Sequence, residues 1–125
     1  MFSGEAPVFQ QLAATIADDI VAGVYPEETA VPSAMDFAAF HRMNPATASK
    51  GVNLLVDLGA LYKKRGIGMF VATGAVDLLR QSRRDDFQAQ YLRPLLNEAQ
   101  LVGISTQELH SMIDSMVDET ERDRP

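Results

Sequence analysis

The stretch PSAMDFAAFHRMNPATASKGVNLLVDLGALYKKRGIGMFV, residues 32–71, decides the fold of this chain. Ser33 and Asp36 lie three positions apart, in the capping-box pattern that opens a helix. Asn44 followed by Pro45 opens a second helix, because asparagine caps helices well and proline suits the first helical position. Only a few residues separate the two helices. This arrangement predicts a helix-turn-helix.

The second of these helices is predicted to span residues 45–58 and to end at Gly59. Residues 61–71 then form two short apolar or basic runs on either side of Gly66 and Gly68, which is typical of a β-hairpin. A small hairpin directly after a helix-turn-helix is a wing. Residues 45–58 are therefore expected to be the recognition helix, and 61–71 the wing.

The flanking sequence is predicted to be helical. Pro7 opens an amphipathic helix that ends near Gly23. After the wing, helical spacing indicates helices over Val76–Val102, with a kink or break at Pro94, and over Ser105–Glu119. The fold class is thus mostly α with a small β-hairpin: a winged helix-turn-helix domain, residues 1–73, and a C-terminal two-helix segment, residues 74–125.

Composition excludes several classes of protein. The chain has 125 residues, of which 46% are hydrophobic, enough to bury a core and too many for a disordered chain. It has no cysteine, so it has neither disulfides nor thiolate metal sites. No apolar run is long enough to span a bilayer, and the N-terminal residues lack a signal-peptide pattern. We expect a cytoplasmic protein without membrane contacts.

The charge distribution is more informative than the net charge of −6. Residues 1–40 carry six acidic and no basic side chains. Residues 41–73 carry five basic side chains against one acidic side chain, a net charge of +4, and residues 74–125 have a net charge of −4. The helix-turn-helix and wing therefore form a basic segment between acidic ends. Such a segment favours nucleic acid as a partner, although most charged runs are simply solvated.

The start of the recognition helix and the wing supply the candidate contacts with double-stranded DNA. Helix N-terminal residues contact base edges in the major groove, free N–H groups there attract phosphate, and glycines let a wing approach the backbone closely. The candidate residues are Ser33, Arg42, Asn44, Ala46, Thr47, Ser49, Lys50, Lys63, Lys64, Arg65, Gly66 and Gly68. The structural alternatives are ordinary capping by Asn44 and Thr47, and a solvated hairpin.

Catalysis and metal binding find little support. The two histidines, His41 and His110, have no cysteine beside them, and a metal site would need carboxylates such as Asp114, four residues after His110. No serine, histidine and carboxylate arrangement indicates a nucleophile. We therefore expect a protein that is not an enzyme and has neither a cofactor nor a metal.

The C-terminal helices carry apolar stripes that one thin layer does not bury. A second copy of the chain would cover them, which predicts a homodimer. The residues expected at this interface are Phe87, Tyr91, Leu95, Leu109, Met112, Ile113 and Met116.

Residues 6–73 also resemble the GntR family of bacterial regulators. The resemblance is carried by Pro7–Leu12, Ile20–Gly23, Pro32–Ser33, Asn44–Thr47, Lys50, Leu55, Gly59 and Arg65–Val71. The remaining 50 or so residues are too few for the family's larger effector-binding domains, so the length resembles the YtrA-type branch.

The chain departs from the family pattern at four positions. Met35 stands where the family usually has arginine, Lys50 and Lys64 replace arginines, and Val52 replaces an aromatic residue. Lysine keeps the charge but loses bidentate geometry, whereas Met35 loses the charge altogether. These changes are expected to alter the affinity or the DNA sequence recognised.

The resemblance implies a sequence-specific transcriptional regulator, a dimeric repressor that binds an inverted-repeat operator and occludes a promoter. Whether a small-molecule effector takes part is left open. The alternative is a winged-helix protein-interaction module that has lost operator binding, which the acidic pI of about 4.7 and Met35 favour.

Overall fold

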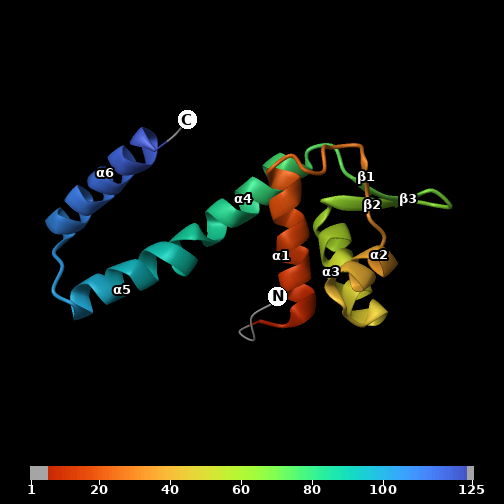
Figure 1. Ribbon diagram of the computed structural model, residues 1–125, viewed down its shortest axis with the longest axis horizontal. Helices are drawn as coiled ribbons and strands as arrows, with labels where there is room; N and C mark the ends of the chain where they lie inside the picture. The colour runs from red at the N-terminus through yellow and green to blue at the C-terminus, as the bar shows by residue number, and fades with distance from the viewer. Residues whose placement is uncertain (1–5, 124–125) are drawn as a thin grey trace. The chain divides into compact units, whose positions relative to one another are not determined.

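The computed structural model describes residues 6–123 and divides into two units, Met1–Arg83 and Arg84–Pro125. In chain order the first unit contains α1 (Val8–Val21), β1 (Ala30–Val31), α2 (Ala34–His41), α3 (Pro45–Leu58), β2 (Leu61–Lys64), β3 (Gly68–Val71) and most of α4 (Ala75–Phe87) (Figure 1). The winged helix-turn-helix predicted from the sequence is confirmed.

The predicted helix caps are present. The Ser33 hydroxyl accepts a hydrogen bond from the Asp36 N–H, and the Asp36 carboxylate accepts one from the Ser33 N–H, so the capping box is complete. The Asn44 side chain accepts from the Ala46 N–H at 2.8 Å, and Pro45 is the first residue of α3. These local interactions fix where α2 and α3 begin.

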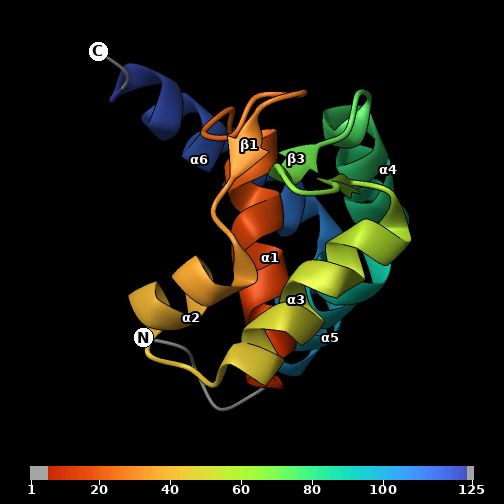
Figure 2. The ribbon, with the colours of Figure 1, turned by 90° about the vertical axis from the view of Figure 1, so that its right-hand side faces the viewer.

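The core of the first unit lies where α3 packs between α1 and α2. Its largest fully buried side chains include Leu12, Ile16 and Ile20 of α1 and Val52 of α3. Figure 2 looks onto α2 and α3, with α1 behind them. α1 and α3 approach so closely that a Cβ atom at Gly51 would lie 2.8 Å from the Phe9 carbonyl oxygen.

The wing belongs to a three-stranded antiparallel sheet in the order β1-β3-β2. β2 and β3 are the predicted hairpin. β1, which was not predicted, pairs with β3 so that Val31 lies opposite Met69. A strand of two residues is too short to show alternation, so no periodic signal marks it.

The first unit extends beyond residue 73, where the sequence suggests a domain boundary. Ala75 and Leu79 of α4 are buried in the same cluster as the core of the winged helix. Ala75 and Leu79 therefore belong to the hydrophobic core of the first unit.

The second unit continues with the π-helical turn η1 (Gln88–Leu92), α5 (Arg93–Leu101) and α6 (Thr106–Arg122). The predicted disruption at Pro94 takes the form of this wider turn, in which the Arg93 N–H donates to the Gln88 carbonyl. Ser105 caps α6 through its hydroxyl, which accepts from the Glu108 N–H, and α6 runs three residues past the predicted end at Glu119. No helix within residues 6–123 is long and apolar enough to cross a membrane.

Candidate nucleic-acid interface

The turn between α2 and α3 exposes the start of α3. Arg42 ends α2 in the left-handed conformation, with φ 52°, and the Met43 N–H donates to the Ala38 carbonyl at 3.0 Å. The chain then reverses so that Asn44 and Ala46 are exposed. Three predicted contact residues, Arg42, Asn44 and Ala46, therefore lie on the surface at one end of α3.

The outward face of α3 carries an amide, Asn53, that was not among the predicted contact residues. Ala48, Gly51, Val52 and Leu55 are buried. At roughly 100° per residue, the opposite face carries Ala46, Lys50 and Asn53. Thr47 is half-buried and lies toward one edge of this face. Asn53 follows Ala46 by seven residues, and this spacing is the signal that could have identified it.

Lys50 is exposed, but its ammonium is directed toward α1. The Nζ atom lies 4.2 Å from the centroid of the Phe9 ring. A cation over an aromatic face is attracted by the ring's quadrupole. Lys50 therefore belongs to the edge of the interface that borders α1.

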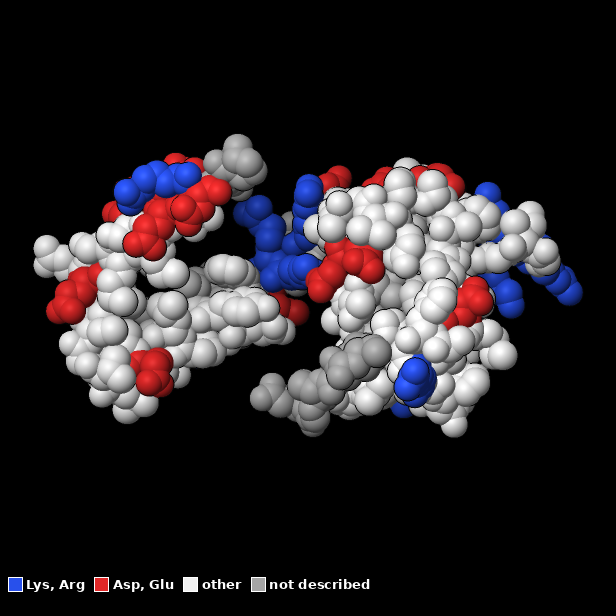
Figure 3. All heavy atoms as spheres, in the orientation of Figure 1, with Lys and Arg blue, Asp and Glu red and all other residues white. Residues whose placement is uncertain are grey.

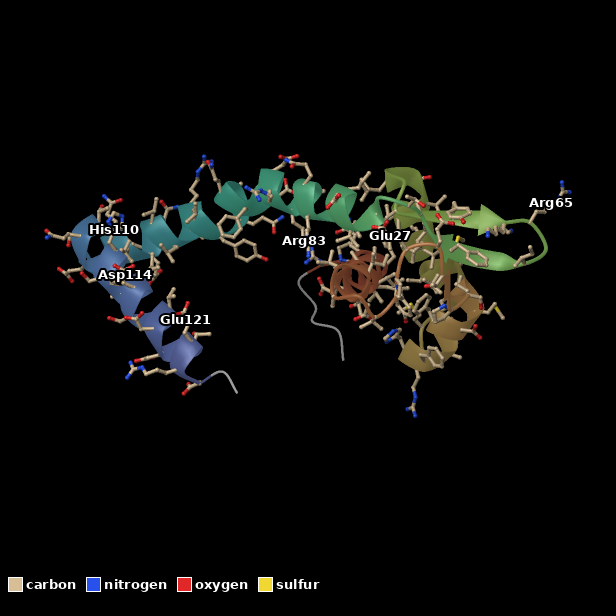
Figure 4. The ribbon with its side chains drawn as sticks, turned by 90° about the horizontal axis from the view of Figure 1, so that it is seen from above. Glu27, Arg65, Arg83, His110, Asp114 and Glu121 are labelled. Atoms are coloured by element: carbon tan, nitrogen blue, oxygen red, sulfur yellow. The ribbon has the colours of Figure 1, made fainter. Side chains whose placement is uncertain are left out.

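The three cations of the wing occupy different positions. Lys64 lies over Phe70, with Nζ 4.3 Å from the ring centroid, and also near Tyr62. Because neighbouring residues of a strand point to opposite faces, Lys63 lies on the other face of the wing. Arg65 is at the tip, where its side chain extends away from the strands (Figure 4).

The wing turn depends on glycine. The Ile67 N–H donates to the Lys64 carbonyl at 2.9 Å, and Gly66 has φ +76°. Glycine adopts this left-handed conformation without strain. The narrow tip thus leaves Arg65 and Ile67 as the exposed side chains of the turn.

A groove of about 590 Å³ separates the wing from the helix-turn-helix. Its polar lining comes from Ser33 and Asp36 at the start of α2, Ser49 and Asn53 of α3, and Lys63 of the wing. The Asp36 carboxylate is engaged in the capping box with Ser33. Met35 and Met69 add apolar surface. The structure therefore brings Ser33, Ser49 and Lys63 together, although they are up to 30 residues apart in the sequence.

Among the described residues, no ion pair neutralises the cations of the wing, although the Glu28 carboxylate attracts Lys64. Within residues 6–123 the ion pair found is Arg83 with Asp18, on the α1 side of the unit, and none involves Lys63, Lys64 or Arg65. In the space-filling view, basic side chains gather over the wing, at the right of the first unit (Figure 3). Unpaired cations beside a groove provide electrostatic attraction for a polyanion.

The apolar residues predicted for the dimer fall into two groups. Phe87, Tyr91, Leu95, Met112, Ile113 and Met116 are between 42% and 65% exposed. Leu109, by contrast, is only 8% exposed, unlike the other residues predicted for the interface.

His110 and Asp114 lie one helical turn apart on α6 (Figure 4). Among the described residues, no group of three or more histidines and carboxylates is placed to hold a metal ion. The pair therefore provides at most two ligands.

No protein-family model matches the chain, and no curated protein matches it. Solved structures do. A transcriptional regulator of the GntR family from Bacteroides thetaiotaomicron is 31% identical, with a TM-score of 0.75 over 90% of this chain and 98% of that one.

Two further structures share the fold. The GntR-family transcription factor YtrA from Sulfolobus acidocaldarius is 23% identical, with a TM-score of 0.52 over 96% of each chain. S. agalactiae BusR, solved in complex with its busA-promotor DNA, is 25% identical with a TM-score of 0.53. That match covers 88% of this chain but 57% of the BusR chain.

Proposed function

Because this chain belongs to the GntR family of transcriptional regulators, we propose that it binds double-stranded DNA sequence-specifically. α3 would enter the major groove, and the wing would follow the adjacent backbone. The observation that carries this proposal is the groove of about 590 Å³ between α3 and the wing, where Ser49, Asn53 and Lys63 face one space. Hydroxyl, amide and ammonium groups are those that contact phosphates and base edges.

The BusR complex supports DNA as the ligand, because BusR shares this fold and is bound to promoter DNA. In this chain, helix α3 exposes its N-terminal end, where the helix dipole favours a phosphate. The unpaired wing cations would add sequence-independent affinity. Met35 contributes no charge where the family usually has one, so the wing would carry a larger share of the phosphate contacts.

We further propose that the protein acts as a homodimer of the YtrA-type branch. Of the described residues in the second unit, only Ala99 and Leu109 are buried. A helical layer with so little core of its own needs a covering partner, and its exposed stripe is apolar. A second copy would also match an inverted-repeat operator, and binding within a promoter would repress transcription.

The test is selection of bound sequences from a random duplex pool by the full-length protein, at a stated salt concentration. We expect enrichment of an inverted repeat whose half-sites are about one helical turn, or a multiple of it, apart. Recovery of no enriched sequence, with the protein folded by circular dichroism, would favour the alternative of a winged-helix interaction module.

A further inference from the structure

Glu28, in the loop before β1, has a backbone conformation that is unusual for its residue type. Its φ angle is +64°, in the left-handed region. A residue with a Cβ pays an energetic cost there, whereas glycine does not. Such conformations persist where the surrounding structure restrains them, and they cluster at functional sites.

Hydrogen bonds to two separate segments hold Glu28 in place. The Tyr62 hydroxyl of β2 donates to Oε1 at 2.5 Å. The Thr73 N–H and hydroxyl, just before α4, both donate to Oε2, at 3.0 and 2.7 Å. The Glu28 N–H donates to the Val71 carbonyl at 2.8 Å. One carboxylate therefore links the root of the wing to the approach to α4.

The neighbouring Glu27 binds the start of α4 itself. Its carboxylate accepts hydrogen bonds from the Gly74 N–H at 2.8 Å and the Val76 N–H at 3.2 Å. The first N–H groups of a helix lack partners within it and are usually capped by a residue just before the helix. Here the cap comes from almost 50 residues earlier in the chain. Figure 4 shows Glu27 beside this end of α4.

A favourable negative charge at the start of α4 does not by itself explain the presence of Glu27 and Glu28, because Asp77 already places a carboxylate in the first turn of this helix. Hydrogen bonds at an exposed site contribute only modestly to stability. What the two glutamates add is geometry: their carboxylates accept five hydrogen bonds, which tie β2 at Tyr62, Thr73 and the first residues of α4 to one short loop.

We propose that Glu27 and Glu28 are positioning residues that fix the direction in which α4 leaves the wing, and so the half-site spacing that the dimer accepts. This rests on the proposed function, since spacing has meaning only for a dimer bound to DNA. The pair, called here the glutamate clamp, touches no DNA. It acts through α4, the helix that continues into the second unit.

The experiment compares the full-length protein with the double variant E27Q/E28Q and with the control D77N. D77N removes one carboxylate from the same helix end without touching the clamp. Each protein is bound to a series of operators that differ only in the number of base pairs between half-sites, and to a single half-site. Amide hydrogen exchange at Gly74 and Val76 reports whether the clamp has opened.

For the wild type and D77N we expect one preferred spacing and slow exchange at both amides. E27Q/E28Q should exchange these amides faster and lose roughly three- to tenfold of its preference for that spacing, while single half-site affinity stays unchanged. Faster exchange with undiminished spacing preference would overturn the proposal. A wild type that binds no operator at all would instead refute the proposed function.

Discussion

Lys63, Lys64 and Arg65 are consecutive basic residues, yet they occupy three different surroundings. Lys63 lines the groove, Arg65 extends from the wing tip, and Lys64 lies over two aromatic rings. A plot of the logarithm of the DNA-association constant against the logarithm of salt concentration has a negative slope. We expect K63A and R65A each to make this slope shallower by about 0.9, the value of one phosphate contact. K64A should change the slope by less than half of that. Binding measured between low and high salt provides the comparison, and equal effects at all three positions would contradict it.

Asn53 is the amide on the outward face of α3. Asparagine forms bidentate hydrogen bonds with adenine, and such a contact discriminates by about 1–3 kcal/mol. N53A should therefore weaken binding to the selected operator by this amount and binding to random duplex much less. Thr47 is half-buried at the edge of the same face. T47A should show a smaller difference between the two DNAs. If N53A lowers both affinities equally, Asn53 contacts phosphate instead of a base.

At the scale of elements, Gly51 sets the distance between α1 and α3. A methyl group there would meet the Phe9 carbonyl oxygen and the Leu12 side chain. Overpacking costs about 1–3 kcal/mol, which exceeds the gain of about 1 kcal/mol in helix propensity from glycine to alanine. We expect G51A to lower the free energy of unfolding by up to about 2 kcal/mol in urea denaturation, the overpacking cost less the gain in helix propensity. N53A, on the exposed face of the same helix, is the control and should leave it nearly unchanged.

The loop that carries Glu28 should show a pH-dependent stability. Hydrogen bonds from Tyr62 and then from Thr73 hold the pKa of Glu28 below its usual value of 4.5. A carboxyl group whose pKa is lower in the folded than in the unfolded protein stabilises the fold at pH values above its unfolded pKa. This contribution disappears as the pH falls through the folded pKa. Wild type should therefore be more stable than E28Q at pH 7, and the difference should shrink below about pH 4.5. Urea midpoints at several pH values would show it, and a constant difference would contradict the assignment.

The boundaries of these elements were predictable where the determining interactions are local. Ser33, Asn44 and Gly59 each act on residues within a turn of themselves, so the sequence shows where α2 and α3 begin and where α3 ends. β1 and the contacts of Glu28 depend on partners between 34 and 45 residues away. No local pattern reports such pairings.

The candidate interface was predictable in its location but not in its details. The order of helix, turn, helix and glycine wing predicts that α3 and the wing share one surface, and the groove between them has this arrangement. It does not indicate that Lys50 leans toward Phe9 or that Lys64 packs on Phe70, because both contacts depend on how elements dock. Asn53 was missed because it lies two turns into α3, beyond the N-terminal residues considered.

At the scale of the whole molecule, the exposed apolar stripe of the second unit predicts self-association. I113D places a charge among Met112, Met116 and Val117, which are all about half exposed. We expect it to weaken the dimer by about 2 kcal/mol or more, as loss of a central interface residue does. S111D adds the same charge to the opposite side of α6 and should leave the dimer intact.

Analytical ultracentrifugation of both variants and of the wild type measures this effect. Operator affinity should fall with I113D, because separate monomers bind the two half-sites independently. S111D should leave operator affinity unchanged. A wild type that sediments as a monomer at micromolar concentration and still binds an asymmetric single site tightly would contradict the dimer.

The π-helical turn at Gln88–Leu92 bears on how this stretch tolerates changes in length. Such a turn is wider than an α-helical turn, so it accommodates an extra residue while the flanking helices keep their own hydrogen bonds. Pro94 stabilises this solution, because it has no N–H to offer a regular helix at that place. Removing a single residue from the turn would force it into α-helical geometry and place Pro94 inside a regular helix, where its ring clashes with the carbonyl four residues earlier. A one-codon deletion here would therefore cost stability without removing any apolar side chain of α5, so this stretch should tolerate shortening far less well than substitution of its exposed residues.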